Sequence, residues 1–218
     1  MPQIPLCVQM APSPGARRCF LTALLAAGLA PWLVACDRAD SSAAPADFKG
    51  IDITGADYAQ EFALTDMRGA ARSLTDFRGK AVLLYFGFVQ CPDVCPTALA
   101  RTVEVLHLLG PEAAKRVQLL FITVDPERDT PELLREYMAA FDPSFVALTG
   151  SLDQIKTTAD AFRVYFKKVP TGSSYTMDHT ALTYLFDPQG KVRAALRHEQ
   201  TASDYAADVQ KVLAEMPA

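Results

Sequence analysis

Two cysteines separated by three residues are the clearest chemical signal in this sequence. They lie in the segment Cys91-Pro92-Asp93-Val94-Cys95-Pro96, shortly after a continuous apolar run. Such a pair can form a structural disulfide, act as a redox dithiol, or bind a soft metal ion such as Cu(I) or Zn(II) through two thiolates. The thioredoxin-type redox motif has one residue fewer between its cysteines. The longer spacing loosens the ring of a disulfide and favours a metal ion between the sulfurs.

The neighbouring elements predict where this pair lies. Ala81–Phe88 is uniformly apolar, as expected of a strand buried on both faces, and Thr97–Leu109 carries apolar residues along one helical face. In α/β sheets, chemistry collects beyond the carboxyl ends of strands. Because Pro96 would break a helix that had already begun, we expect Cys91 in a loop and Cys95 near the start of the helix. Helix amides at that position would stabilise thiolates.

One of three histidines is placed to add a nitrogen ligand. His179 precedes the apolar strand Ala181–Phe186, and in thioredoxin-like folds that junction faces the cysteine loop. Redox enzymes of that fold have a cis-proline there, whereas residues 172–187 contain no proline. An imidazole beside two thiolates completes a Cys2His set, which is a familiar copper environment. We expect His107 at the edge of the core and His198 on the surface.

Three carboxylates are candidates for ordering the groups around such a site. Asp93 lies between the cysteines, Asp125 ends the second buried strand, and Asp178 precedes the candidate histidine. Asp178 could hold the imidazole of His179 in one tautomer. Asp125 has an alternative role, which is to order the loop before the helix capped by Thr130.

The remaining pattern predicts one α/β domain. Further strands are expected at Val117–Val124, Phe145–Leu148, Ala181–Phe186 and Lys191–Leu196. Further helices are expected at Leu133–Phe141, at Leu152–Phe166 and from the cap Ser203 to Leu213. This alternation predicts a sheet with helices on both faces.

The first 35 residues are typical of a secretory signal. Arg17-Arg18 precedes the apolar run Phe20–Ala35, which is short for the roughly 30 Å hydrocarbon core of a membrane. Leu33-Val34-Ala35-Cys36 resembles the lipobox of bacterial lipoproteins, which implies cleavage before Cys36 and lipidation of that cysteine. The alternatives are an uncleaved run that stays as a membrane anchor, and export by the twin-arginine route.

Three segments are therefore expected. Residues 1–35 are a signal peptide of lipoprotein type, residues 36–50 a flexible tether, and residues 51–218 the folded domain. Acyl chains on Cys36 would hold the domain at the periplasmic face of the bacterial cell membrane without spanning it. One close cysteine pair then remains in an oxidising compartment.

Composition excludes several other classes of protein. There are 21 Lys and Arg against 25 Asp and Glu, which gives a net charge of -4 and no basic footprint for nucleic acid. With 50% hydrophobic residues, the chain is too apolar to be disordered, and its five cysteines are too few for a disulfide-stapled mini-protein.

The chain resembles the Sco/SenC family through four short motifs in a specific order. These are Phe86-Gly87-Phe88, Cys91-Pro92-Asp93-Val94-Cys95-Pro96, Val124-Asp125-Pro126-Glu127-Arg128-Asp129-Thr130-Pro131 and Asp178-His179-Thr180. The resemblance covers nearly all of residues 51–218. It implies a thioredoxin-like fold with a central mixed sheet, and it implies that Cys91, Cys95 and His179 bind copper.

The resemblance also implies a function. Members of the family are copper metallochaperones that help assemble the dinuclear copper (CuA) site of cytochrome c oxidase. We therefore expect Cys91 and Cys95 to bind Cu(I) as thiolates, and His179 to permit Cu(II) as well. The expected recipient is cytochrome c oxidase subunit II or another periplasmic copper protein. Because oxidation of the pair would abolish copper binding, a periplasmic thiol reductant is also expected.

An enzymatic alternative uses the same two cysteines. A thiol–disulfide reductase could keep the copper-ligand cysteines of the recipient reduced, with Cys91 and Cys95 as the redox-active pair. The sequence favours a carrier over this enzyme. A peroxiredoxin is disfavoured, because the positions that its motif assigns to Pro and to Thr or Ser before the cysteine hold Leu84 and Phe88.

Overall fold

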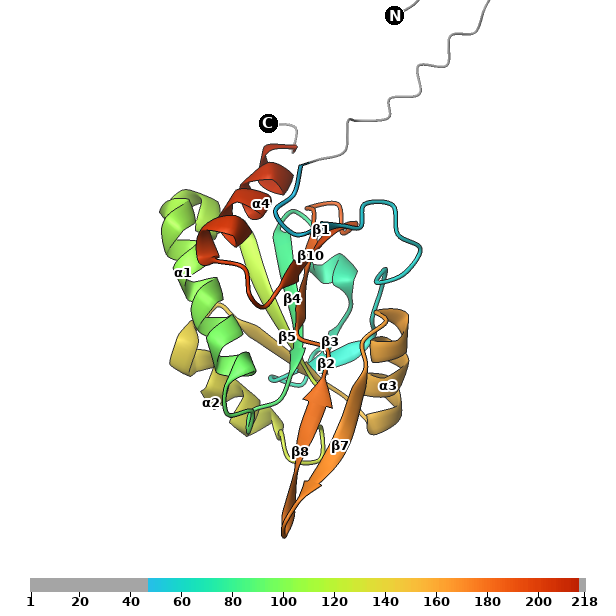
Figure 1. Cartoon of the computed structure of the whole chain (residues 1–218). Helices are drawn as coiled ribbons and strands as arrows, with labels where there is room; N and C mark the ends of the chain where they lie inside the picture. The colour runs from blue at the N-terminus through green and yellow to red at the C-terminus, as the bar shows by residue number, and fades with distance from the viewer. Residues whose placement is uncertain (1–46, 216–218) are drawn as a thin grey trace, which may run out of the picture. The chain divides into compact units, whose positions relative to one another are not determined.

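The computed structural model describes residues 47–215, which fold around a mixed sheet of eight strands (Figure 1). The strand order is β1-β10-β9-β4-β5-β6-β2-β3. The strands are β1 (Ile51–Asp52), β2 (Leu64–Asp66), β3 (Ala71–Arg72), β4 (Ala81–Gly87), β5 (Val117–Thr123), β6 (Val146–Thr149), β9 (Leu182–Phe186) and β10 (Val192–Arg197). Strands β4, β5 and β6 run parallel, whereas β9 pairs with β4 in the antiparallel direction.

Helices cover both faces of this sheet. They are α1 (Val94–Ala114), α2 (Pro131–Phe141), α3 (Leu152–Ala161) and α4 (Ala202–Ala214), with a short 3-10 helix, η1 (Leu74–Phe77). Figure 1 shows α1, α2 and α4 on one side of the sheet and α3 on the other. Every residue of β4 and β5 is buried, as their largely apolar sequences predict. The expected α/β sheet with helices on both faces is confirmed.

The predicted helix Leu152–Phe166 is wrong in its last five residues. The helix ends at Ala161, and Arg163 adopts a left-handed conformation with φ of 54°. The amide of Arg163 donates to the carbonyl of Asp160, and the amide of Val164 donates to the carbonyl of Ala159. This pair of bonds is a Schellman motif, which closes the end of a helix.

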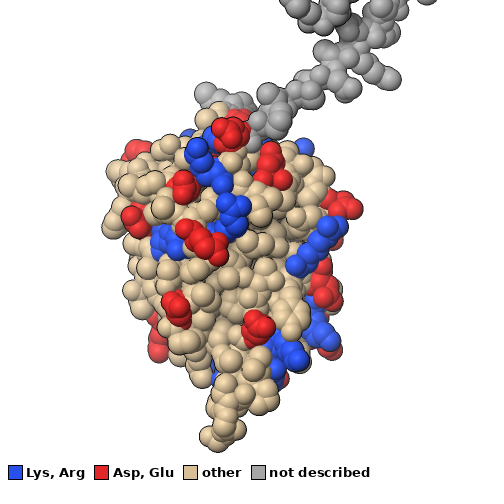
Figure 2. Space-filling model, in the orientation of Figure 1, with Lys and Arg blue, Asp and Glu red and all other residues tan. Residues whose placement is uncertain are grey.

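A β-hairpin that the sequence did not predict follows this helix. It consists of β7 (Phe166–Thr171) and β8 (Ser174–His179), which pair with each other and form a separate two-stranded sheet. The hairpin projects from the body at the lower end of Figure 1, and its tip, residues 169–174, carries no charged side chain (Figure 2). His179 is the last residue of β8, so the hairpin positions the candidate nitrogen ligand.

The folded unit begins before residue 51. Phe48 is buried, and the amides of Lys49 and Gly50 each donate to the carboxylate of Asp208 at 2.8 Å. The end of the expected tether therefore packs against α4. The signal peptide, Cys36 and most of the tether lie outside the described residues. Among the described residues, no helix combines the length and the apolar composition that crossing a membrane requires.

Candidate metal centre

The cysteine pair lies where β4 gives way to α1. Asp93 is the N-cap residue of α1, so Cys91 lies in the loop and Cys95 in the first turn of the helix. Pro96 also lies in the first turn, where a helix does not use the amide hydrogen that proline lacks. The local sequence thus explains why the helix can begin at Val94 although a proline follows two residues later.

Neither cysteine forms a disulfide, and both sulfurs lie at the first turn of α1. The amide of Cys95 donates to Sγ of Cys91 at 3.4 Å. Cys95 is fully buried, whereas 9% of Cys91 is exposed. The partly accessible sulfur is therefore the one that an incoming ion or thiol would meet first.

The pair shares one proton unequally. Several effects together lower the pKa of Cys91 to about 4. The largest is a hydrogen bond from Cys95; His179 and the backbone amides of Asp93 and Cys95 also lower the pKa, and burial opposes them. The same hydrogen bond, together with burial, raises the pKa of Cys95 above its ordinary value. At neutral pH the site therefore holds one thiolate, on Cys91, and one thiol, on Cys95.

A glycine makes room for the buried sulfur. A Cβ atom on Gly87 would lie 3.0 Å from Sγ of Cys95 and 2.8 Å from the ring of Phe121. The hydroxyl of Tyr85 lies 4.0 Å from the same sulfur, and burial and the nearby Cys95 raise the pKa of this tyrosine. The end of β4 thus surrounds the Cys95 sulfur with tightly packed, largely apolar groups.

The β7–β8 hairpin places His179 next to the Cys95 sulfur. Its Nε2 atom lies 3.5 Å from Sγ of Cys95, and its Nδ1 atom lies 3.1 Å from the carbonyl oxygen of Thr180. Because a carbonyl can only accept, Nδ1 carries the hydrogen in the neutral ring, and the lone pair of Nε2 faces the sulfur. The ring packs edge-to-face against Tyr85 and Phe88, with centroid separations of 6.1 and 5.8 Å.

The three candidate ligand atoms form one compact group. Sγ of Cys91, Sγ of Cys95 and a ring nitrogen of His179 all lie within 4.8 Å of one another. Metal–ligand bonds of about 2.0–2.3 Å place neighbouring ligand atoms roughly 3.5–4 Å apart, so small movements would close the group around one ion. Two thiolates and an imidazole are soft and borderline donors, which suit copper better than hard ions. The donor set therefore fits copper, and the ligand role of the three residues stays a prediction.

The candidate carboxylates occupy different environments. Asp93 is exposed and contributes its backbone amide to Cys91 rather than its side chain. Asp178 is also exposed, and the contact to Nδ1 of His179 that we expected from it is made by the carbonyl of Thr180. Asp125 is 1% exposed, and its side chain contacts the hairpin.

Asp125 is part of a cluster that the sequence did not single out. Its carboxylate accepts from Nε of Arg128 at 2.5 Å and from the hydroxyl of Tyr175 at 2.9 Å. The arginine lies within one of the quoted motifs, which was the only available signal. Tyr175 lies on β8 in a segment without a motif, so no sequence pattern pointed to it.

A second buried acid fixes the start of the cysteine loop. One carboxylate oxygen of Asp129 accepts from the amide of Val89 at 3.1 Å and from the hydroxyl of Thr123 at 2.6 Å. Burial raises the pKa of Asp129 to about 6. This residue joins the end of β5 to the loop that carries Cys91, a role that the sequence analysis did not assign.

The other two histidines stand apart from this group. Among the described residues, the only cluster of three or more potential metal ligands is the one that contains His179. His107 is exposed rather than at the edge of the core, and His198 is half-buried.

Comparison with known proteins gives a consistent result. The family model described as SCO1/SenC matches residues 52–214. A mitochondrial SCO2 homolog from Bos taurus is 42% identical over 183 residues, which cover 81% of this chain and 68% of that protein. The chain spans about two thirds of the length of the curated relatives that it matches.

Solved structures are similar as well. The structure of Bradyrhizobium japonicum ScoI with copper bound is 43% identical, with a TM-score of 0.64, and the match covers 70% of this chain and 97% of that chain. A SCO1/SenC family lipoprotein from Bacillus anthracis is 27% identical, with a TM-score of 0.60, covering 70% of this chain and 93% of that one. The expected thioredoxin-like fold is confirmed, and the chain belongs to the SCO1/SenC family.

Proposed function

We propose that this protein is a copper metallochaperone that holds copper as cargo between Cys91, Cys95 and His179. The observation that carries the proposal is the convergence of two thiol sulfurs and an imidazole nitrogen within 4.8 Å. Copper bound to a Sco relative from Bradyrhizobium japonicum supports the choice of metal. We further propose that the cargo is delivered for assembly of the CuA site, with cytochrome c oxidase subunit II or another periplasmic copper protein as recipient.

Capture of Cu(I) requires little rearrangement of protons. Cys91 is already a thiolate, and the lone pair of His179 Nε2 already faces the site, so only Cys95 must lose a proton. The proton leaves to solvent when the sulfur of Cys95 bonds to the ion. Binding of Cu(I) near pH 7 should therefore release roughly one proton per ion.

Delivery would follow the order of accessibility. His179 is half-buried, Cys91 is 9% exposed and Cys95 is fully buried. Thiolates of a recipient would therefore replace the bonds to His179 and Cys91 before the bond to Cys95. Replacement of one ligand at a time keeps the ion coordinated during transfer.

The test is copper retention and delivery by variants of the full chain. His179→Ala should weaken copper retention by an order of magnitude or more yet still reduce disulfides through its intact cysteines. Cys91→Ser should lose both properties. Equal copper retention by the native protein and His179→Ala would overturn the three-ligand proposal.

A thiol–disulfide reductase is the second candidate. The observation that favours it is the partly exposed Cys91 thiolate beside a buried thiol, because an attacking thiolate and a resolving thiol are what disulfide reduction requires. The thiolate of Cys91 would attack a disulfide of the recipient and release one recipient thiolate. Cys95 would then displace the second recipient thiolate, which takes up the proton of Cys95, and form a Cys91–Cys95 disulfide, which two thiols of a periplasmic reductant must reduce again.

We propose that the domain is held at the periplasmic face of a bacterial cell membrane through lipidated Cys36. The lipobox-like segment and the lipoprotein relative from Bacillus anthracis support this. Tethering would raise the concentration of the domain near a membrane-bound recipient. Cys36→Ala should abolish incorporation of labelled fatty acid, and labelling that persists in this variant would contradict the proposal.

A further inference from the structure

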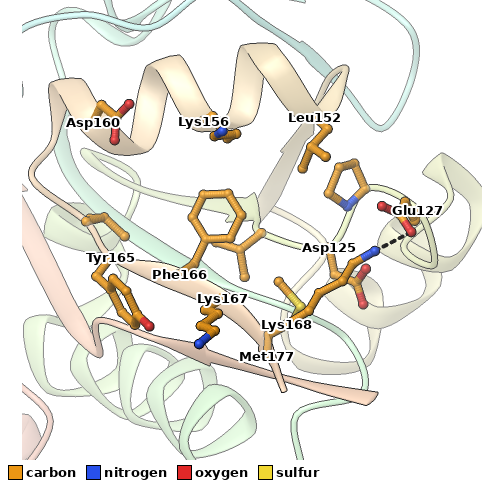
Figure 3. A pocket seen from close by; sticks show the side chains of 13 residues that line it. Asp125, Glu127, Leu152, Lys156, Asp160, Tyr165, Phe166, Lys167, Lys168 and Met177 are labelled. Carbon is orange, nitrogen blue, oxygen red and sulfur yellow. Dashed lines mark hydrogen bonds and ion pairs between the residues drawn. The ribbon is translucent and has the colours of Figure 1, made fainter. Parts of the chain in front are cut away.

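His179 lies on a hairpin that has no strand pairing with the main sheet. Its strand, β8, pairs with β7 and is not part of the eight-stranded sheet. A cavity of about 330 Å³ separates the hairpin from α3 (Figure 3). Phe166 and Met177 line it from the hairpin, and Leu152 and Lys156 line it from the helix. On this side, the hairpin faces open space instead of close-packed side chains.

Arg128 supports the hairpin from the body of the protein. Its Nη1 atom donates to the backbone carbonyl of Tyr175 at 2.8 Å, and its guanidinium lies 3.7 Å from the centre of the Tyr175 ring. Nε donates to Asp125, whose other oxygen accepts from the hydroxyl of Tyr175. Arg128, Asp125 and Tyr175 thus form a closed ring of contacts between the loop after β5 and strand β8.

The same guanidinium also reaches the cysteine loop. Nη1 of Arg128 lies 3.1 Å from Oε1 of Gln90, the residue before Cys91. Arg128 therefore contacts both segments that supply candidate ligands. Its side chain is 17% exposed and the carboxylate of Asp125 is 1% exposed, so the pair is well shielded from water.

A second ion pair on the hairpin is a weaker support. Nζ of Lys168 lies 2.5 Å from Glu127, but the two side chains are 41% and 51% exposed (Figure 3). Pairs exposed to this degree contribute little to stability. The planar fork of Arg128, which bonds three partners and stacks on a ring, has no equivalent in a lysine.

We propose that Arg128 is a positioning residue of the metal centre, which holds the β7–β8 hairpin, and with it the imidazole of His179, against the cysteine loop. The measurements of copper binding that test this proposal rest on the proposed copper-binding function. Hydrogen exchange of the metal-free protein tests the position of the hairpin separately.

The first test measures hydrogen exchange of the hairpin amides in the metal-free full chain. Arg128→Met should accelerate exchange in residues 166–179 by about 10-fold or more, because it removes hydrogen bonds to a charged, shielded group. Arg135→Met makes the same change at an exposed position of α2 and should leave hairpin exchange unchanged. Tyr175→Phe removes only the hydroxyl bond to Asp125 and gives a milder variant if Arg128→Met does not fold.

The second test is a double-mutant cycle with His179→Ala, read from the Cu(II) electron paramagnetic resonance spectrum and from the copper dissociation constant. Arg128→Met should weaken the nitrogen coupling and raise the dissociation constant in the native background by about 10-fold. It should change neither in the His179→Ala background. Arg128→Lys should not rescue the nitrogen signal, since the ammonium lacks the planar fork.

Two results would overturn the proposal. One is native exchange rates for the hairpin in folded Arg128→Met and Tyr175→Phe. The other is an equal loss of copper affinity with and without His179. If the native protein bound no copper, the proposed function would fail, and the exchange measurement would still decide the role of Arg128.

Discussion

Replacing Cys95 with alanine should raise the pKa of Cys91 toward its ordinary value of 9.0. The hydrogen bond from Cys95 is the largest of the effects that bring the pKa of Cys91 down to about 4. In the variant, burial would still raise the pKa of Cys91, while His179 and the backbone amide of Asp93 would still lower it.

The expected signature lies in the pH dependence of Cys91 reactivity. A thiol with a pKa of about 4 is almost entirely ionised at pH 7, whereas one with a pKa near 9 is about 1% ionised. Intrinsic nucleophilicity falls with the pKa, with a Brønsted coefficient of about 0.4–0.5, which offsets essentially all of that gain near pH 7. The reaction rate at neutral pH therefore says little about the pKa of Cys91, whereas the dependence of the rate on pH reports it directly.

The assay is alkylation by iodoacetamide of the reduced, metal-free protein, with the label on Cys91 followed by mass spectrometry. The native rate should be nearly constant from about pH 5 to 9, and the rate for Cys95→Ala should rise through this range. His179→Ala should retain a mostly flat profile, because its effect on Cys91 is smaller. Native and Cys95→Ala profiles that rise together near pH 8 to 9 would refute the conclusion that a hydrogen bond from Cys95 lowers the pKa of Cys91.

Three further predictions follow from buried groups. Gly87→Ala should destabilise the domain by about 1–3 kcal/mol in urea unfolding, because the new methyl group overlaps Phe121 and crowds the Cys95 sulfur. Unchanged stability and copper retention would contradict the tight packing around Cys95. Asp129 should contribute stability that is complete below pH 3.8 and is lost as pH rises through about 6, since burial raises its folded pKa. This component, about 3 kcal/mol at most, should be absent from Asp129→Asn in thermal unfolding across that range. Cu(I) titration in weakly buffered solution near pH 7 should release roughly one proton per ion, and release of two would place a proton on Cys91.

The sequence predicted the sheet well because its central strands are buried on both faces. Residues 81–87 are apolar throughout, and residues 117–123 are apolar except for Gln118 and Thr123, as burial on both faces favours. The end of α3 was missed for a physical reason. Phe162 and Phe166 continue the helical spacing of apolar residues, but the closing turn has Arg163, not glycine, in the left-handed conformation, so the sequence carries no stop signal there.

The hairpin was missed because its strands are largely exposed and therefore show no apolar alternation. The candidate ligands could be proposed from residue type and position alone, since Cys91, Cys95 and His179 border strands that meet in the sheet. The support by Arg128 could not, because it depends on a contact with Tyr175, which lies 47 residues away in the chain.

X-ray absorption of the Cu(I)-loaded native protein and of Cu(I)-loaded His179→Ala identifies the atoms bonded to copper. We expect one copper per chain bonded to two sulfurs and one nitrogen, with the nitrogen lost in the variant and the sulfurs retained. A coordination shell that contains sulfur alone, or a nitrogen that persists without His179, would contradict this expectation.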